Sequence, residues 1–241
     1  MKEFCTSLVR AGGLKSLIPA FMGLGLSHTR ATHGASAASF EEEYCLSVLA
    51  ALLWHLPMPH PRVAPFGEGA GIERLRLISK FSEDSGAKAQ RLLELRSSYV
   101  GKVSRAEENF NEKEEGGEES EEEDEALLRR AEVLLKAGLF TLHRIDLVIA
   151  RILTEDAFLK DLWGAEIVGK PTGPEAGILE KCEGASFALR SKFHEQGHSV
   201  VAILEGLSGY AGGLEGVDGG VERQSVDELI KKLKTVTGLE Q

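Results

Sequence analysis

The sequence has few aromatic residues and few prolines, and it lacks the alternation of β-branched and polar residues that is typical of strands. Phe, Trp and Tyr make up 6% of the 241 residues, and seven residues are prolines. Leu, Ala, Glu, Lys and Arg dominate instead, and these residue types favour helices. With 42% hydrophobic residues, the chain can bury a sizeable core in one or two compact units. We therefore expect an all-α protein.

Cysteines are also few, and long apolar runs are missing. Cys5, Cys45 and Cys182 are an odd number of widely spaced residues, which implies no disulfide framework and favours buried free thiols in a reducing compartment. No segment reaches the about 18 consecutive apolar residues that a membrane-spanning helix needs.

The apolar stretch 17–26 follows basic residues, as in a signal peptide. Pro19 and two glycines interrupt this stretch, however, so we do not expect secretion.

Negative charge is abundant and is concentrated in one place. The chain has a formal charge of −10, and the run 107–125 (EENFNEKEEGGEESEEEDE) holds twelve carboxylates and one lysine. The rest of the chain is therefore nearly neutral, and we interpret the run as an insertion between helices, with a disordered acidic loop over residues 107–122. An acidic chain does not suit broad binding to nucleic acid or to an anionic membrane, whereas basic partners suit it.

Apolar residues recur every three or four positions in the first half of the chain, which predicts amphipathic helices. We expect a short helix pair or the end of a helix over residues 12–22, and a loop over residues 27–39. Ser39 and Glu42 stand at capping-box spacing before the next helix, which ends at Pro57. Its expected apolar face comprises Cys45, Val48, Leu49, Leu52 and Leu56.

Two helices are expected before the acidic run, and one long helix after it. The first spans residues 72–81, and the second begins at Ser85 with an apolar face of Leu92, Leu95, Tyr99 and Val103. After the run, Ser120 and Glu123 form a second potential capping box. An unbroken apolar stripe then predicts one helix of about seven turns. The stripe comprises Leu128, Ala131, Leu135, Leu139, Leu142, Ile145, Ile149 and Ile152.

The last third should contain a loop over residues 164–177 and a helix over residues 186–210, with Phe187 and Phe193 among its apolar residues. Glycines then predict a flexible linker over residues 212–224. Ser225 and Glu228 cap a final amphipathic helix over residues 225–237. This gives a helical domain over residues 1–211, a linker and a terminal helix. Paired helices that each have one apolar face build either a bundle or a helical solenoid.

Several of these segments together resemble the beta-catenin-like protein family. The segments are IERLRLISKFSED (72–84), QRLLELRSSYVGKV (90–103), LKAGLFTLHRIDLVIARI (135–152), GGLKSLIPAFM (12–22) and EEEYCLSVLAALLWHL (41–56). The resemblance covers roughly residues 8–155 and the C-terminal part of a family member. It implies an armadillo-like helical repeat array, an α-solenoid, of which this chain is the C-terminal portion. We also expect it to be a truncated or isolated part of a longer repeat domain.

The resemblance further implies a nuclear, spliceosome-associated scaffold without catalytic activity, cofactor, membrane contact or direct nucleic-acid contact. Its partners would be splicing-complex proteins, bound through basic segments of the nuclear-localisation type. Acidic residues on stacked helix pairs would suit such peptides. The candidate partner-binding residues are Glu41, Glu42, Glu43 and Glu94, together with the acidic run. The alternative is that these residues form only a solvated face and a disordered loop.

A rival function rests on the sequence HEQGH at residues 194–198. In an H-E-x-x-H motif, His194 and His198 would lie one helical turn apart and bind zinc, and Glu195 would activate a water molecule in a hydrolase. A third ligand is not evident, because no histidine follows His198, and Gly197 weakens the helix that must hold the ligands. The simpler interpretation is two surface histidines.

Other patterns carry little chemistry. The glycine-rich GEGAG (67–71) and GKP (169–171) lack the flanking strand and helix of phosphate-binding loops, so they are interpreted as turns. Cys45 and His55 would be about 15 Å apart on one helix, too far for a nucleophile and its base. Three lysines near the C-terminus are expected on a solvated helix face, although they could contact an acidic partner. They are Lys231, Lys232 and Lys234.

Overall fold

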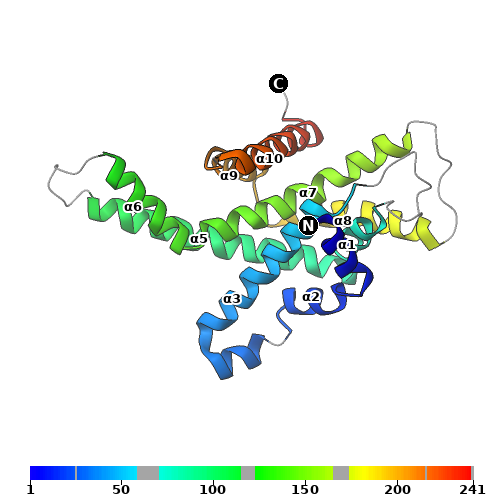
Figure 1. Ribbon diagram of the computed structural model, residues 1–241, viewed down its shortest axis with the longest axis horizontal. Helices are drawn as coiled ribbons and strands as arrows, with labels where there is room; N and C mark the ends of the chain where they lie inside the picture. Colours follow the sequence, from blue (N-terminus) through cyan, green and yellow to red (C-terminus); the bar gives the residue numbers. More distant parts are fainter. Residues whose placement is uncertain (25, 59–70, 115–122, 165–173, 215, 240–241) are drawn as a thin grey trace.

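All regular elements are helical in the computed structural model, which describes residues 1–24, 26–58, 71–114, 123–164, 174–214 and 216–239 (Figure 1). The elements are α1 (Lys2–Arg10), α2 (Leu14–Phe21), α3 (Leu26–His55), α4 (Ile72–Ser79), the 3₁₀ turn η1 (Asp84–Gly86), α5 (Ala87–Glu114), α6 (Glu123–Lys136), α7 (Leu139–Gly164), α8 (Pro174–Glu195), α9 (Val200–Gly212) and α10 (Gly216–Thr237). The prediction of an all-α protein is confirmed. Among the described helices, none combines the length and apolar character that crossing a membrane requires.

Helix α7 forms the centre of the molecule. Its consecutive buried residues face all directions, as expected of a helix that is covered on every side. They are Ile145, Leu147, Val148, Ile149, Ala150, Ile152 and Leu153. Helices α3, α5, α8, α9 and α10 all pack against α7. In Figure 1, α9 and α10 lie on one side of α7, and α5 and α3 lie on the other.

Two ion pairs are buried where α4 and α5 meet α7. The Nε and Nη2 atoms of Arg74 on α4 lie 2.8 and 2.9 Å from the carboxylate oxygens of Glu155 on α7, and Nη1 donates to the carbonyl of Leu53. Because the last carbonyls of a helix lack helical partners, this guanidinium also caps the end of α3. Arg96 on α5 donates to Asp146 on α7 at 2.7 Å. These contacts fix α3, α4 and α5 on the central helix.

The long apolar stripe does not form one helix. The chain breaks at Ala137 and Gly138 between α6 and α7, and Gly138 has a φ of +100°. A side chain at Gly138 would place its Cβ 2.7 Å from the ring of Tyr99, so only glycine fits this close approach. Leu128 and Leu135 on α6 are 73% and 56% exposed. The prediction of one buried helix was therefore wrong for its first half.

Part of the predicted acidic loop is helical. Helix α5 continues to Glu114, so residues 107–114 extend it, while residues 115–122, including Ser120, lie outside the described residues. Helix α6 begins at Glu123 and packs against α5. Figure 1 shows this α5–α6 hairpin projecting from the body of the molecule. Helix propagation from the buried part of α5 outweighs the mutual repulsion of its last acidic residues.

The predicted loop over residues 27–39 is also helical. It belongs to α3, so Ser39 lies inside a helix and is not its cap. Four alanines among these residues have high helix propensity, and one internal glycine does not stop propagation from the packed end. The buried face differs slightly from the prediction, because Val48 is partly exposed. Its members are Leu46, Leu49, Ala50, Leu52, Leu53 and Leu56.

The predicted helix 186–210 is two helices. Helix α8 ends at Glu195, and α9 begins at Val200; between them Gly197 has a φ of +67°. A left-handed residue ends a helix, and glycine adopts this conformation without steric cost. Phe193 is buried as expected, but Phe187 is exposed.

The glycine-rich linker is shorter than predicted. Helix α10 already begins at Gly216, so Ser225 is not its cap. The predicted terminal helix is therefore the second half of α10, and it packs against α7 and α9 with Val226, Leu229 and Leu233 buried. The hydroxyl of Tyr210 on α9 donates to Glu222 at 2.6 Å. The glycines cost helix propensity, and packing of the apolar face offsets that cost.

The remaining helices agree more closely with the prediction. Residues 12–22 hold one helix, α2, and not a pair, while α1 precedes them and was not predicted. Helix α4 begins at Ile72, and α5 begins two residues after Ser85. Cys5 and Cys182 are buried free thiols as expected, whereas Cys45 is half-buried. Burial raises the pKa of Cys182 to about 12, so this thiol stays protonated.

Candidate partner-binding surface

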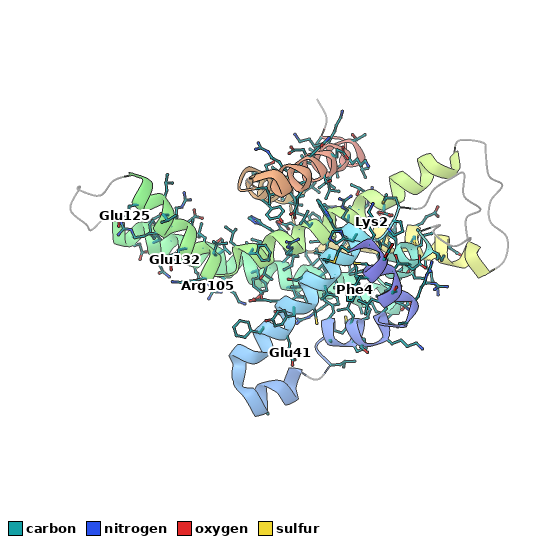
Figure 2. All side chains as sticks on the ribbon, viewed as in Figure 1. Lys2, Phe4, Glu41, Arg105, Glu125 and Glu132 are labelled. Atoms are coloured by element: carbon teal, nitrogen blue, oxygen red, sulfur yellow. The ribbon has the colours of Figure 1, made fainter. Side chains whose placement is uncertain are left out.

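The outward side of α3 carries an apolar stripe that solvent reaches. Phe40, Tyr44 and Val48 are spaced four residues apart and are 55%, 70% and 38% exposed. Figure 2 labels Glu41, the residue after Phe40 in the chain, on the part of α3 that extends away from the body of the molecule. Side chains four residues apart share one face of a helix. Large exposed apolar side chains gathered on one face are a feature of interaction surfaces.

The predicted acidic residues lie on α3, in the same segment as this stripe, and on α5, which two of them contact. Glu42 on α3 lies 2.7 Å from Arg91 on α5, and Arg91 also lies 4.0 Å from Glu94. The Tyr99 hydroxyl donates to Glu43 at 3.3 Å. Arg91 thus brings Glu42 and Glu94 together, and Glu43, the next residue of α3, contacts α5 about two turns further along, at Tyr99. We call Phe40, Glu41, Glu42, Glu43, Tyr44, Val48 and Glu94 the α3–α5 surface.

The electrostatics of this surface are negative. It holds four carboxylates, of which Glu42 and Glu94 share the partly buried Arg91, and Glu41 and Glu94 are exposed. Burial, followed by the charges of Glu41 and Glu42, raises the pKa of the neighbouring Cys45 thiol. Carboxylates accept hydrogen bonds from Lys and Arg, and the faces of Phe40 and Tyr44 can attract the same cations. The partner-binding role of the four glutamates stays a prediction.

The HEQGH segment does not build the platform that a zinc hydrolase needs. His194 is in the last turn of α8, but the helix ends at Glu195, so His198 is not one helical turn further on. His198 instead packs on the ring of Phe193, with centroids 5.2 Å apart, and lies 3.2 Å from the side-chain oxygen of Gln196. No group of three or more His, Cys, Asp or Glu side chains is placed to hold a metal ion in the described part of the chain.

The other sequence patterns gain no chemistry from the fold. Cys45 and His55 both belong to α3, with the separation that excludes direct contact. Residues 67–70 and 169–171 lie outside the described residues. Lys231 and Lys234 are exposed on α10, as predicted for a solvated face.

Two features of the molecular surface do not follow from the sequence pattern. The spacing of Phe40, Tyr44 and Val48 is visible in it, but the pattern predicts that Val48 is buried, and Phe40 follows a predicted loop directly. The sequence gives no sign of a cavity lined by Lys and Arg residues of α2, α4, α5 and α8, because these residues are far apart in the chain.

Comparison with known proteins identifies the family. The model of the family described as "Catenin-beta-like, Arm-motif containing nuclear" matches residues 1–163. The chain belongs to this family. The resemblance seen in the sequence is therefore confirmed, as is the armadillo-like helical repeat fold. The match ends at the last turn of α7, so α8, α9 and α10 lie beyond it.

Individual members of the family give the same result. The chain is 30% identical to beta-catenin-like protein 1 of Homo sapiens in an alignment of 160 positions that covers 61% of this chain and 24% of that protein. Beta-catenin-like protein 1 of Rattus norvegicus is 31% identical over the same share of each chain. The chain thus spans about a quarter of the length of the curated relatives it matches.

Proposed function

We propose that this protein is a non-enzymatic helical scaffold for protein–protein contacts in the nucleus, and that it acts in pre-mRNA splicing as a spliceosome-associated component. Its partners are splicing-complex proteins that contribute basic segments of the nuclear-localisation type. The observation that carries this proposal is the family match over residues 1–163, a family described as Arm-motif containing and nuclear.

The α3–α5 surface supports the choice of a basic partner. It lies within the matched residues and combines exposed carboxylates with exposed aromatic rings. A basic peptide would place Lys or Arg side chains near Glu41 and Glu94, and its cations would also lie over the rings of Phe40 and Tyr44. The described cysteines and histidines supply no activated nucleophile, which favours binding over catalysis.

Fluorescence titration with a labelled, lysine- and arginine-rich nuclear-localisation-type peptide tests the surface. The double variant Glu41→Gln and Glu94→Gln removes two exposed charges, and we expect its affinity to fall about tenfold, because ion pairs between exposed groups contribute about 0.2–1 kcal/mol each. The matched control, Glu205→Gln with Asp227→Asn, removes two exposed charges from α9 and α10 and should bind within about twofold of the wild type.

Pull-down from nuclear extract tests the cellular role separately. The wild-type chain should recover splicing factors, and the Glu41→Gln, Glu94→Gln variant should recover less. Recovery of no splicing factor by this chain or by a full-length relative would contradict the splicing role. Equal weakening of peptide binding by both double variants would show that overall charge, and not the α3–α5 surface, attracts the peptide.

A further inference from the structure

A cavity of about 510 Å³ is lined by residues of α1, α2, α4, α5 and α8 and of the turns beside them. The contact between α1 and α4 is held by Arg10, whose Nε donates to Glu73 at 2.6 Å. The residues that line the cavity are Val9, Gly12, Leu14, Lys15, Ile18, Pro19, Arg76, Ser79, Lys80, Glu83, Lys88 and Lys181. We call it the basic cavity. Its volume is in the range of about 300–1,000 Å³ that is typical of ligand pockets.

The charge of this lining is opposite to that of the whole chain. Five of the lining residues are Lys or Arg, and Glu83 is the single acid among them, although the protein has a formal charge of −10. A concave surface of one sign concentrates ions of the other sign. The basic cavity is therefore a local positive field on an acidic protein.

Two of the cations are neutralised within the cavity wall. Glu83 lies 2.8 Å from Lys80 and 3.5 Å from Lys88, and Asp84 also pairs with Lys88. Asp84, Ser85 and Gly86 all have positive φ angles, and this tight left-handed turn places Glu83 between the two lysines. The hydrogen bond from Lys88 and the positive charge of Lys88 hold the pKa of Asp84 below its usual value, and the charge of Lys80 adds a smaller effect.

The other three cations have no acidic partner among the residues that the structure describes. Lys15 comes from α2, Arg76 from α4 and Lys181 from α8, and all three are exposed. Three elements that are distant in sequence thus bring uncompensated positive charges to one cavity. Like charges repel even near water, so an anion between them would relieve repulsion as well as form new charge-assisted hydrogen bonds.

The part of the lining that α1 and α2 contribute is largely apolar. Val9, Leu14, Ile18 and Pro19 line the cavity there, and Lys15 is the one cation from these two helices. A simple inorganic anion would leave this wall unused. A fitting ligand carries an oxyanion next to an apolar group, as a linear peptide does when an acidic or phosphorylated residue adjoins a large aliphatic one.

We propose that the basic cavity binds a short peptide segment in which a phosphoserine, phosphothreonine or glutamate lies beside leucine-like side chains. Arg76, with its planar fork of donors, contacts the oxyanion together with Lys15 and Lys181, and the aliphatic neighbours pack on the α1–α2 wall. The cavity and the α3–α5 surface have opposite charge, so this binding is independent of the proposed recognition of basic segments.

The test is fluorescence anisotropy with a labelled heptapeptide whose central phosphoserine is flanked by leucines. Parallel peptides carry glutamate or serine at the centre, or phosphoserine flanked by serines. We expect the phosphoserine or the glutamate peptide to bind, and the stronger of the two identifies the oxyanion. The central-serine peptide lacks the oxyanion, and the peptide with serine flanks lacks the aliphatic side chains. Each should therefore bind about tenfold more weakly.

Matched protein variants decide where the peptide binds. Arg76→Gln with Lys181→Gln should weaken binding about tenfold, and Lys15→Gln alone should weaken it in the same direction. The control, Lys231→Gln with Lys234→Gln, makes the same charge change on α10 and should leave the affinity within about twofold. All changed residues are exposed, and circular dichroism confirms that the variants remain folded.

Three outcomes would overturn the proposal. They are failure of all the peptides to bind, equal weakening by the two double variants, and binding of inositol hexakisphosphate at this cavity without binding of either acidic peptide. The last outcome would make the cavity a site for a small polyanion.

Discussion

Asp146 and His143 lie one turn apart on α7 and respond to pH in opposite ways. One carboxylate oxygen of Asp146 accepts a hydrogen bond from Arg96 at 2.7 Å. The backbone of Gly206 on α9 lies so close to the other oxygen that an added Cβ atom would be 2.8 Å from it, so α9 covers the carboxylate. Burial outweighs the arginine and raises the pKa of Asp146 to about 6. Burial, assisted by Arg144, lowers the pKa of His143 to about 4.

The two shifts predict opposite slopes of stability between about pH 4 and pH 6.5. A raised pKa means that the folded state holds the proton of Asp146 more tightly, so stability from this group is lost as pH rises through about 6. A lowered pKa means that the folded state prefers neutral His143, so stability is lost as pH falls below 6.5 towards 4. In the wild type, the pH dependence of stability that comes from one group should partly cancel that from the other.

Urea denaturation over this pH range measures the effect. Relative to the wild type, His143→Gln should make the free energy of unfolding fall more, or rise less, with increasing pH, and Asp146→Asn should change the slope in the opposite direction. His55 and His198 also have lowered pKa values, but they are present in both variants and cancel in the comparison. The same slope in all three proteins would contradict the prediction.

At the scale of single elements, two left-handed glycines decide where helices end. Gly138 separates α6 from α7, and Gly197 separates α8 from the turn before α9. The sequence displays both glycines, but glycine also occurs inside helices here, as Gly101 does in α5. What distinguishes Gly138 is the ring of Tyr99, which leaves no room for a Cβ atom. The break redirects α6 along α5, and the apolar residues of α6 therefore remain exposed.

Gly138→Ala should destabilise the protein by about 1–3 kcal/mol, because it adds both a left-handed alanine and a clash with Tyr99. Urea denaturation measures this change. The control is Gly209→Ala in α9, whose new Cβ would meet no atom within 4 Å and whose helix propensity would improve. It should leave stability unchanged or raise it by up to about 1 kcal/mol. A Gly138→Ala variant as stable as the wild type would show that α6 can move away from Tyr99.

At the scale of the whole molecule, the segment beyond the family match shares the core of the matched segment. Helices α8, α9 and α10 all pack against α7, and α8 also packs against α4 and α5. Arg144 of α7 lies 3.8 Å from Glu222 of α10, and the ring of His143 lies 5.3 Å from that of Tyr210 on α9. The C-terminal helices therefore cover a face of α7 that would otherwise be apolar and exposed.

Leu233→Ala tests this shared core, because Leu233 on α10 is fully buried. We expect a loss of about 2–4 kcal/mol and a single unfolding transition in urea. Native-state hydrogen exchange should show reduced protection in α7 as well as in α10, because one helix covers the other. Separate unfolding of α10, with α7 still fully protected, would show that the C-terminal helices form an independent unit.

The sequence determined the all-α class, most helix positions and, through local segments such as those around α4, α5 and α7, the family itself. These features depend on apolar periodicity and propensity, which are properties of residues close together in the chain. It also indicated the acidic residues of the α3–α5 surface, but not that Arg91 joins Glu42 to Glu94. Tertiary structure decided the break at Gly138 and the docking of α10. It also assembled the basic cavity. In each case the deciding contact joins residues far apart in sequence, and packing energy between elements overrides local preference.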